Sequence, residues 1–236
     1  MNRAILEKIS EGLRQGIYAA SWGGELWGPL GAIKLSKLRF QALKELGDEK
    51  GALSALSSTY YTAAGNARAK GRVGRAFWCA IQAMLLSDDL EEKYGLRNLT
   101  PDELDIRSRI LFMVWRYRDS LRVSREALSR GISSPDTRAL LEMGLAETLS
   151  ALGKEIEATH AWARAIELAT KVKPTTLVRV HRALAGHCFK IGDRERGHQE
   201  LGMALRVAHE NGLQDQIVKI TALADRAEKK AGELKN

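Results

Sequence analysis

The chain has 236 residues, 44% of them hydrophobic and 28% charged, which is ordinary for a globular protein. Its 37 lysine and arginine residues against 29 aspartate and glutamate residues give a formal charge of +8, which permits an anionic partner without proving one. The longest apolar run, residues 110–115, is too short to span a bilayer, and the first residues lack the apolar core of a signal peptide. We therefore expect a cytoplasmic protein.

Residues 1–31 are predicted to form a short N-terminal helix and a loop. Apolar side chains recur at a spacing of four, which predicts an amphipathic helix over residues 3–15: Ile5, Ile9 and Leu13. The glycines and the proline of residues 21–31 are expected to prevent regular helix. Trp22 and Trp27 in this stretch are predicted to fold back onto the first hairpin, or alternatively to form an exposed docking loop.

The middle of the chain contains further helical segments separated by turn residues. These are predicted at residues 32–46, 50–64, 66–87, 102–116 and 118–130. Gly47 and Asp48 mark the first turn, and the acidic run of residues 88–92 is expected to end the third helix. Thr100, followed by a proline and then by Glu103, predicts a capped helix start, because threonine and glutamate at this spacing form a capping box.

The second half begins with Ser134 and Pro135, a similar helix start. Two hairpins and one last helix are then predicted at residues 136–152 with 155–171, 175–190 with 194–210, and 213–232. The last helix has one apolar face and a polar remainder, as suits a cap on a stack of helices. The chain is therefore predicted to be all-α, with about 10–12 helices.

One pattern occurs twice, 39 residues apart. The first copy is Leu145, Ala146, Leu149, Gly153, Ala158, Trp162 and Ala165, and the second is Leu184, Ala185, Cys188, Gly192, Gly197, Leu201 and Ala204. Each copy places small residues around a turn glycine and one bulky residue. Small residues let two helices approach closely while the bulky one fills the gap, so the pattern predicts stacked helical hairpins.

These copies resemble tetratricopeptide repeats, which carry Leu-small-x-x-Tyr in the first helix and Ala-x-x-x-Phe-x-x-Ala in the second. Weaker copies start at Ala52 and Ser120, which are 68 residues apart, or twice the usual period of 34. The family's first-helix Trp and Tyr are absent from both strong copies. The resemblance implies a right-handed solenoid over residues 32–212 with a capping helix at 213–236. It also implies a concave groove lined by the first helices, and protein–protein interaction as the commonest role.

In that register, basic residues dominate the groove. The predicted partner-binding residues are Lys37, Gln41, Lys44, Arg109, Phe112, Arg179, Arg182, Phe189 and Lys190. Arginine gives paired hydrogen bonds to carboxylates, so an acidic peptide of a partner protein is the expected ligand. The other interpretation is that these residues form ordinary solvated helix faces. Our first hypothesis is a non-enzymatic scaffold or adaptor that binds such a segment.

A second basic feature supports a different hypothesis. The middle of the chain carries an arginine series: Arg107, Arg109, Arg116, Arg118, Arg122, Arg125 and Arg130. Such a stripe could follow a phosphate backbone, which predicts a protein associated with nucleic acid. Asp105, Asp119 and Glu126 lie at helical spacing from these arginines and could instead pair with them. A third hypothesis is a subunit that oligomerises through the ends of its solenoid.

No motif indicates catalysis or a cofactor. The chain has no phosphate-binding glycine loop followed by lysine and no Gly-x-Ser-x-Gly nucleophile turn, so we expect no enzyme activity. His181, His187, Cys188 and His198 are close in sequence but lack the spacing of a helical metal pair, so no metal site is predicted. Cys79 also lies in an apolar context, and both cysteines are predicted to be buried free thiols.

Overall fold

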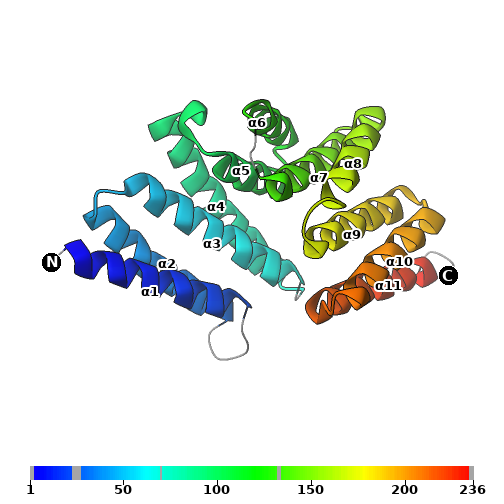
Figure 1. Ribbon diagram of the computed structural model, residues 1–236, viewed down its shortest axis with the longest axis horizontal. Helices are drawn as coiled ribbons and strands as arrows, with labels where there is room; N and C mark the ends of the chain where they lie inside the picture. The colour runs from blue at the N-terminus through cyan, green and yellow to red at the C-terminus, as the bar shows by residue number, and fades with distance from the viewer. Residues whose placement is uncertain (1–2, 23–27, 70, 132–133, 234–236) are drawn as a thin grey trace. The chain divides into compact units, whose positions relative to one another are not determined.

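The computed structural model describes residues 3–22, 28–69, 71–131 and 134–233, and all regular structure in these ranges is helical (Figure 1). The helices are α1 Arg3–Trp22, α2 Gly28–Glu45, α3 Glu49–Ala69, α4 Val73–Tyr94, η1 Leu96–Asn98, α5 Pro101–Met113, α6 Tyr117–Ser129, α7 Pro135–Ala151, α8 Glu155–Ala169, α9 Pro174–Ile191, α10 Arg194–Glu210 and α11 Gln214–Glu233. The predicted all-α helical repeat is confirmed.

The predicted loop over residues 21–31 is wrong at both ends. Helix α1 continues to Trp22, and α2 begins at Gly28. Pro29 lies in the first turn of α2, where a missing N–H breaks no helical hydrogen bond and the fixed φ of proline favours the helix. Residues 23–27, including Trp27, lie outside the described ranges.

The predicted helix over residues 66–87 is displaced. Helix α3 ends at Ala69, Gly71 follows with φ of 70°, and α4 runs from Val73 to Tyr94. A left-handed glycine ends a helix at little steric cost, so Gly71 sets this turn. The acidic residues 88–92 lie inside α4 rather than ending it.

The predicted helix starts are present. Thr100 Oγ1 accepts a hydrogen bond from the Glu103 N–H at 3.3 Å, and Glu103 Oε2 accepts one from the Thr100 N–H at 2.7 Å. This completes the capping box of α5, which satisfies backbone donors that have no partner inside the helix. Ser134 caps α7 by accepting from the Thr137 N–H.

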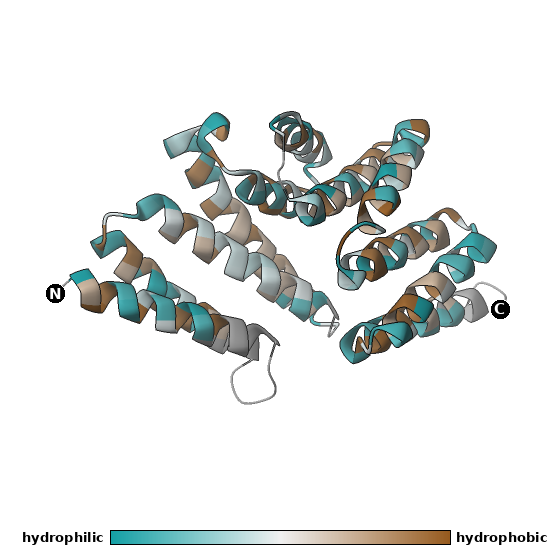
Figure 2. Cartoon of the chain, in the orientation of Figure 1, coloured by the Kyte–Doolittle hydropathy of each residue, from teal (hydrophilic) through white to brown (hydrophobic). Residues whose placement is uncertain are grey.

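The chain packs as two compact units, residues 1–123 and 124–236, each with its own core. In the first unit, α3 and α4 make the most extensive contact, and α2 packs on both α1 and α3. Its core combines small and large side chains: Ile33, Leu56, Tyr60, Ala63, Ala64, Cys79, Ala80, Ala83 and Ile110. Figure 2 shows apolar and polar stretches side by side on these helices, as amphipathic packing requires.

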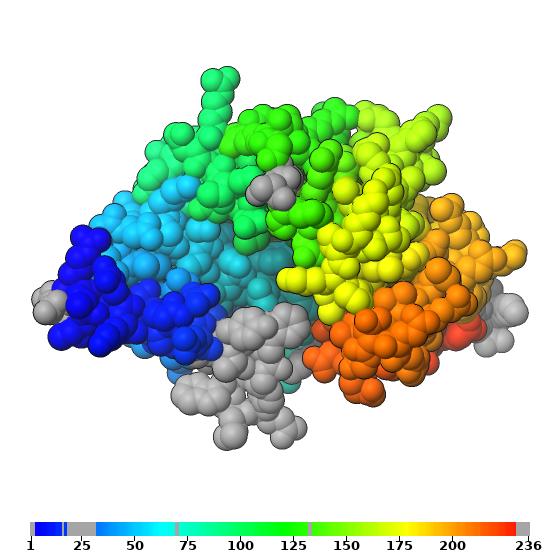
Figure 3. All heavy atoms as spheres, viewed as in Figure 1, coloured from blue at the N-terminus to red at the C-terminus, as the bar shows by residue number. Residues whose placement is uncertain are grey.

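In the second unit, the side chains of the repeated pattern are buried, apart from the turn glycines. The close packing of α9 against α10 depends on Gly197, because a Cβ atom added there would lie 2.5 Å from the Phe189 ring. Figure 3 shows the atoms of these two helices in direct contact on the visible face. The small–bulky–small pattern therefore has the predicted structural meaning: it sets how closely the two helices of a hairpin approach.

At the first-helix Trp position of tetratricopeptide repeats, both hairpins of the second unit have a residue that makes a polar pair. Glu142 on α7, with 5% of its side chain exposed, pairs with Arg164 on α8 at 3.0 Å. Thirty-nine residues later, His181 on α9 lies with its Nδ1 2.6 Å from Glu200 Oε2 on α10. Each hairpin thus joins its two helices through a polar contact where the family has a large apolar side chain, and the two contacts differ in composition.

Candidate interaction surface

The helices α7, α9 and α11 form one layer of the second unit, since α9 contacts both α7 and α11. Helices α8 and α10 pack against α7 and α9 as their hairpin partners. The repeat pattern assigns α7 and α9 to the first position of their hairpins, and α11 is the predicted capping helix that packs beside α9. The face that α7, α9 and α11 share is therefore the candidate binding surface of the second unit.

Four basic side chains come close together on α9 and α11: Arg179, Arg182, Lys219 and Arg226. We call them the cation cluster. Arg182 is half-buried, and its Nη1 donates a hydrogen bond to Gln216 Oε1 on α11 at 3.0 Å, which joins the two helices. Lys219 and Arg226 are exposed one turn or more away along α11. Arg179 and Arg182 are close in sequence, whereas Lys219 and Arg226 join them only because α11 packs on α9.

The electrostatics confirm that these charges act on one another. Burial lowers the pKa of the Arg182 guanidinium, and the nearby charges of Arg179 and Arg226 lower it further, whereas Glu147 on α7 opposes the shift. Burial is also the main cause that lowers the pKa of Lys219, followed by the charge of Arg182. Repulsion among cations in a partly desolvated setting favours an added anion, since a carboxylate would relieve it.

Two of the nine predicted binding residues, Arg179 and Arg182, thus belong to the cation cluster. Phe189 is half-buried, with its ring centroid 5.1 Å from that of His198, and it packs in the core between α9 and α10. Lys190 is exposed in the last turn of α9. The sequence analysis missed Lys219 and Arg226, although their spacing of seven places both on one side of a helix.

The other predicted residues lie in the first unit. Lys37, Gln41 and Lys44 are exposed on α2 and share one side of it. Arg109 on α5 has only 12% of its side chain exposed and donates to Asp105 Oδ1 at 2.8 Å. The ring of Phe112 is half-buried, 5.4 Å from the ring of Tyr117. Arg109 and Phe112 therefore make contacts within the unit, and the α2 residues are the ones that point to solvent.

The arginine series of the middle region is largely paired with carboxylates. Six of its seven members make ion pairs: Arg107 with Asp88 and Glu91, Arg109 with Asp105, Arg116 with Asp88 and Asp119, Arg122 with Glu91, Arg125 with Glu157, and Arg130 with Glu126. Asp105, Asp119 and Glu126 are the partners that helical spacing suggested. Much of the positive charge that would contact phosphates is therefore compensated within the chain.

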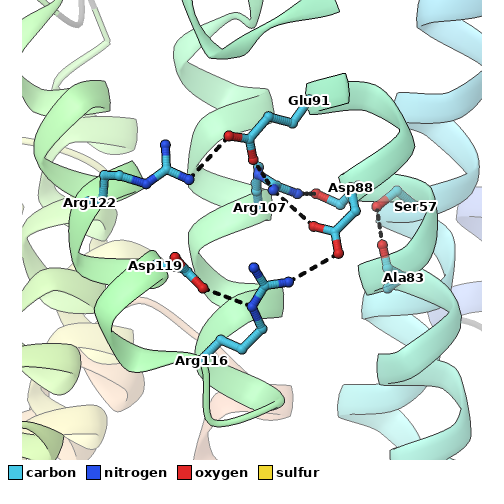
Figure 4. A network of polar contacts seen from close by, with 9 residues as sticks. Ser57, Ala83, Asp88, Glu91, Arg107, Arg116, Asp119 and Arg122 are labelled. Atoms are coloured by element: carbon cyan, nitrogen blue, oxygen red, sulfur yellow. Dashed lines mark hydrogen bonds and ion pairs between the residues drawn. The ribbon is translucent and has the colours of Figure 1, made fainter. Parts of the chain in front are cut away.

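The centre of this network is Arg107, with 3% of its side chain exposed (Figure 4). Its guanidinium on α5 donates to Ser87 Oγ, Asp88 and Glu91, all on α4. Arg116 and Arg122 approach the same two carboxylates from the side of α6. The network is a connection among three helices rather than a free basic surface.

Both cysteines and His187 pack against other side chains inside the fold. Cys79 and Cys188 are free and buried, as predicted, and burial raises the pKa of both thiols. The His187 ring stacks on Trp162 with centroids 6.1 Å apart. Among the described residues, no three His, Cys, Asp or Glu side chains come together in a way that could hold a metal ion.

No helix in the described ranges is both long and apolar enough to cross a membrane.

The chain matches no model of a known sequence family, and no curated protein matches it. Its fold does match solved structures, 34 chains of them. One is described as "MamA RS-1 ArsTM double mutant"; the match covers 89% of this chain and 96% of that one, with 13% sequence identity and a TM-score of 0.53. The chain has a tetratricopeptide-like fold. At 13% identity, the likeness to MamA concerns the fold and nothing more.

Proposed function

We propose that this chain is a non-enzymatic scaffold that binds an acidic segment of a partner protein on the cation cluster. The tetratricopeptide-like fold supports a role in protein interaction in general. The observation that carries the specific proposal is the meeting of four basic side chains where α11 packs on α9, with Arg182 half-buried among them; burial and then the charges of Arg179 and Arg226 lower its pKa. Carboxylate side chains or a carboxylate terminus match that charge.

The physical basis of binding is pre-organisation. Arg182 is already half-buried and held by Gln216, so little side-chain entropy remains to be lost when an anion arrives. The exposed Lys219 and Arg226 then add charge that attracts the partner from a distance. Glu147 and Asp215 limit the net charge of the site, which favours a segment with few carboxylates over a densely charged polymer.

The first experiment is affinity capture with the full chain from a lysate of the cells that produce it, divided into nuclease-treated and untreated halves. The scaffold proposal expects the same proteins in both halves. Loss of the captured material after nuclease would instead support the hypothesis of a nucleic-acid-associated protein, in which the remaining basic side chains bind phosphates.

Charge reversal then locates the site. The double variant Lys219→Glu/Arg226→Glu changes two exposed side chains of α11, so the fold should be retained while capture of the partner is lost. Arg196→Glu/Arg206→Glu makes the same change in charge at exposed positions of α10 and should leave capture intact. Equal capture by both variants would exclude the cation cluster as the binding site.

Self-assembly through the helix ends remains a separate hypothesis. The loop that carries Trp22 and Trp27 is a candidate edge for such contacts, and Trp27 lies outside the described ranges. Light scattering on the full chain tests this hypothesis directly, because a mass above 26.1 kDa would show association.

A further inference from the structure

The first half of α4 and the turn between α5 and α6 carry large apolar side chains that the first unit does not cover. The exposed fractions are 73% for Val73, 47% for Phe77, 49% for Trp78 and 65% for Trp115. We call these four residues the aromatic platform. The rings of Phe77 and Trp115 lie with centroids 5.8 Å apart, so residues distant in sequence form one continuous patch. Exposed tryptophan and phenylalanine at this density mark an interaction surface more often than a solvated face.

Trp115 also has an unusual backbone. Its φ is 61°, and it is the one non-glycine residue with positive φ in the described ranges. The turns α2–α3, α3–α4, α7–α8, α9–α10 and α10–α11 all use glycine in this conformation: Gly47, Gly71, Gly153, Gly192 and Gly212. The α5–α6 turn has an exposed tryptophan with a strained backbone at a position where glycine would adopt the same φ without strain. Strain of this kind is concentrated at functional positions.

The charge on the α4 side of the platform has one sign. The sequence contains no aspartate or glutamate between Glu49 and Asp88. Arg72 and Arg75, which flank Val73, are exposed on the same part of α4, and Arg118 is exposed three residues after Trp115. Arg72 and Arg75 have no carboxylate close to them in sequence, whereas Arg118 is followed directly by Asp119, which pairs with Arg116. The platform therefore combines an apolar centre with a rim that is positive on the α4 side, formed by Arg72 and Arg75.

We propose that the aromatic platform is a second docking surface, and that it binds an amphipathic, acidic helix of a partner protein. The apolar centre would take the hydrophobic face of that helix, and the arginine rim would pair with glutamate or aspartate residues beside it. The apolar strip continues along α4 to Leu85, about 12 Å from Phe77 at the helical rise, which is the length of about two turns of a docked helix. This proposal does not depend on the cation cluster.

A single nucleic-acid strand is a less suitable occupant. Bases bind best on ring faces that are free, whereas Phe77 and Trp115 lie against each other and Trp78 meets Tyr60 edge to face. Val73 and Leu85 are aliphatic and offer no stacking surface. These features suit leucine and phenylalanine side chains of a helix instead.

The test measures binding of the full chain to a fluorescein-labelled synthetic peptide by anisotropy. The peptide carries leucine and phenylalanine at positions i, i+3, i+4 and i+7 and glutamate elsewhere; a peptide of the same composition in scrambled order is its control. Phe77→Ala, Trp115→Gly and the pair Arg72→Glu/Arg75→Glu should each weaken binding by about tenfold or more. Trp115→Gly is the most informative, because glycine fits the backbone at this turn and the variant should fold.

Two matched variants control for general effects. Ile156→Ala removes an apolar side chain that is 79% exposed on α8, and Arg196→Glu/Arg206→Glu reverses two exposed charges of α10 outside both proposed surfaces. Both should bind the peptide like the unmodified chain. The proposal is overturned if the peptide binds no better than its scrambled control, or if Phe77→Ala and Trp115→Gly leave its affinity unchanged. It is equally overturned if single-stranded DNA or vesicles of anionic phospholipid, tested in parallel, bind the platform more tightly than the peptide does.

Discussion

Gly197 sets the distance between α9 and α10, since its missing side chain leaves room for the Phe189 ring. Gly197→Ala should therefore lower the free energy of unfolding by about 1–3 kcal/mol, because the ring must move out of a packed position. Gly202→Ala, in the same helix, meets nothing within 4 Å and should raise it by about 0.5–1 kcal/mol. Urea unfolding of the two variants should give opposite signs, and a shared sign would refute the packing argument.

Trp115 offers a second prediction at this scale. Replacement by alanine and by glycine removes the same ring, but only glycine adopts a positive φ without strain. Trp115→Gly should therefore be more stable than Trp115→Ala by about 1 kcal/mol, although glycine normally destabilises relative to alanine. Thermal unfolding of both variants measures the difference. If alanine were the more stable residue, the strain at this turn would be negligible.

At the scale of elements, the Arg107 network connects α4, α5 and α6 (Figure 4). Glu91 faces both Arg107 and Arg122. Glu91→Gln should cost toward the lower end of about 3–5 kcal/mol, because a buried guanidinium loses one of its two carboxylates. The adjacent Glu92 is exposed, and Glu92→Gln should change stability by less than about 0.5 kcal/mol. Chemical denaturation distinguishes the two, and equal effects would show that the network adds little.

The packing of α8 on α9 predicts a pH dependence. Burial lowers the pKa of His187 below its ordinary 6.5, and the charges of Lys190 and Arg196 add to this, while Glu155 opposes it. The unfolded chain then binds the proton more readily, so stability should fall as the pH drops through the window below 6.5. His187→Gln should reduce this acid loss, whereas His160→Gln, at an exposed position of α8, should not. Urea titrations at pH 7.5 and 5 provide the comparison, and an unchanged acid loss in His187→Gln would contradict it.

The sequence predicted the elements better than it predicted the surfaces. Capping residues such as Thr100 and turn glycines such as Gly153 act locally, so the predicted helix ends after residue 100 agree with the structure within a few residues. The cation cluster was only half predicted, because Lys219 reaches Arg182 through the packing of α11. Phe77 could not be singled out either, since an apolar residue in a helix is normally buried and only the tertiary structure leaves it exposed.

For the whole molecule, the formal charge of +8 limits how the two surfaces can be studied together. Each replacement of an arginine or lysine by glutamate lowers the net charge by two. The four replacements at Arg72, Arg75, Lys219 and Arg226 therefore bring the formal net charge from +8 to zero. That quadruple variant should be less soluble near pH 7 than either double variant, because mutual repulsion between molecules is lost. Precipitation by polyethylene glycol measures this. A control that exchanges lysine and arginine at the four sites keeps +8 and should remain as soluble as the unmodified chain.

The two polar contacts inside the hairpins of the second unit also favour correct pairing of the helices during folding. Glu142 matches Arg164, and His181 matches Glu200, so each first helix has a partner of its own. A spliced chain in which α7 is followed directly by α10 would bring the carboxylates of Glu142 and Glu200 to the same buried place, with no cation between them. Repulsion between carboxylates thus destabilises a mispaired hairpin, whereas the ion pair stabilises a correctly paired one at the same position. An engineer who wished to lengthen this protein by copying one hairpin would need to move both of its helices as a unit.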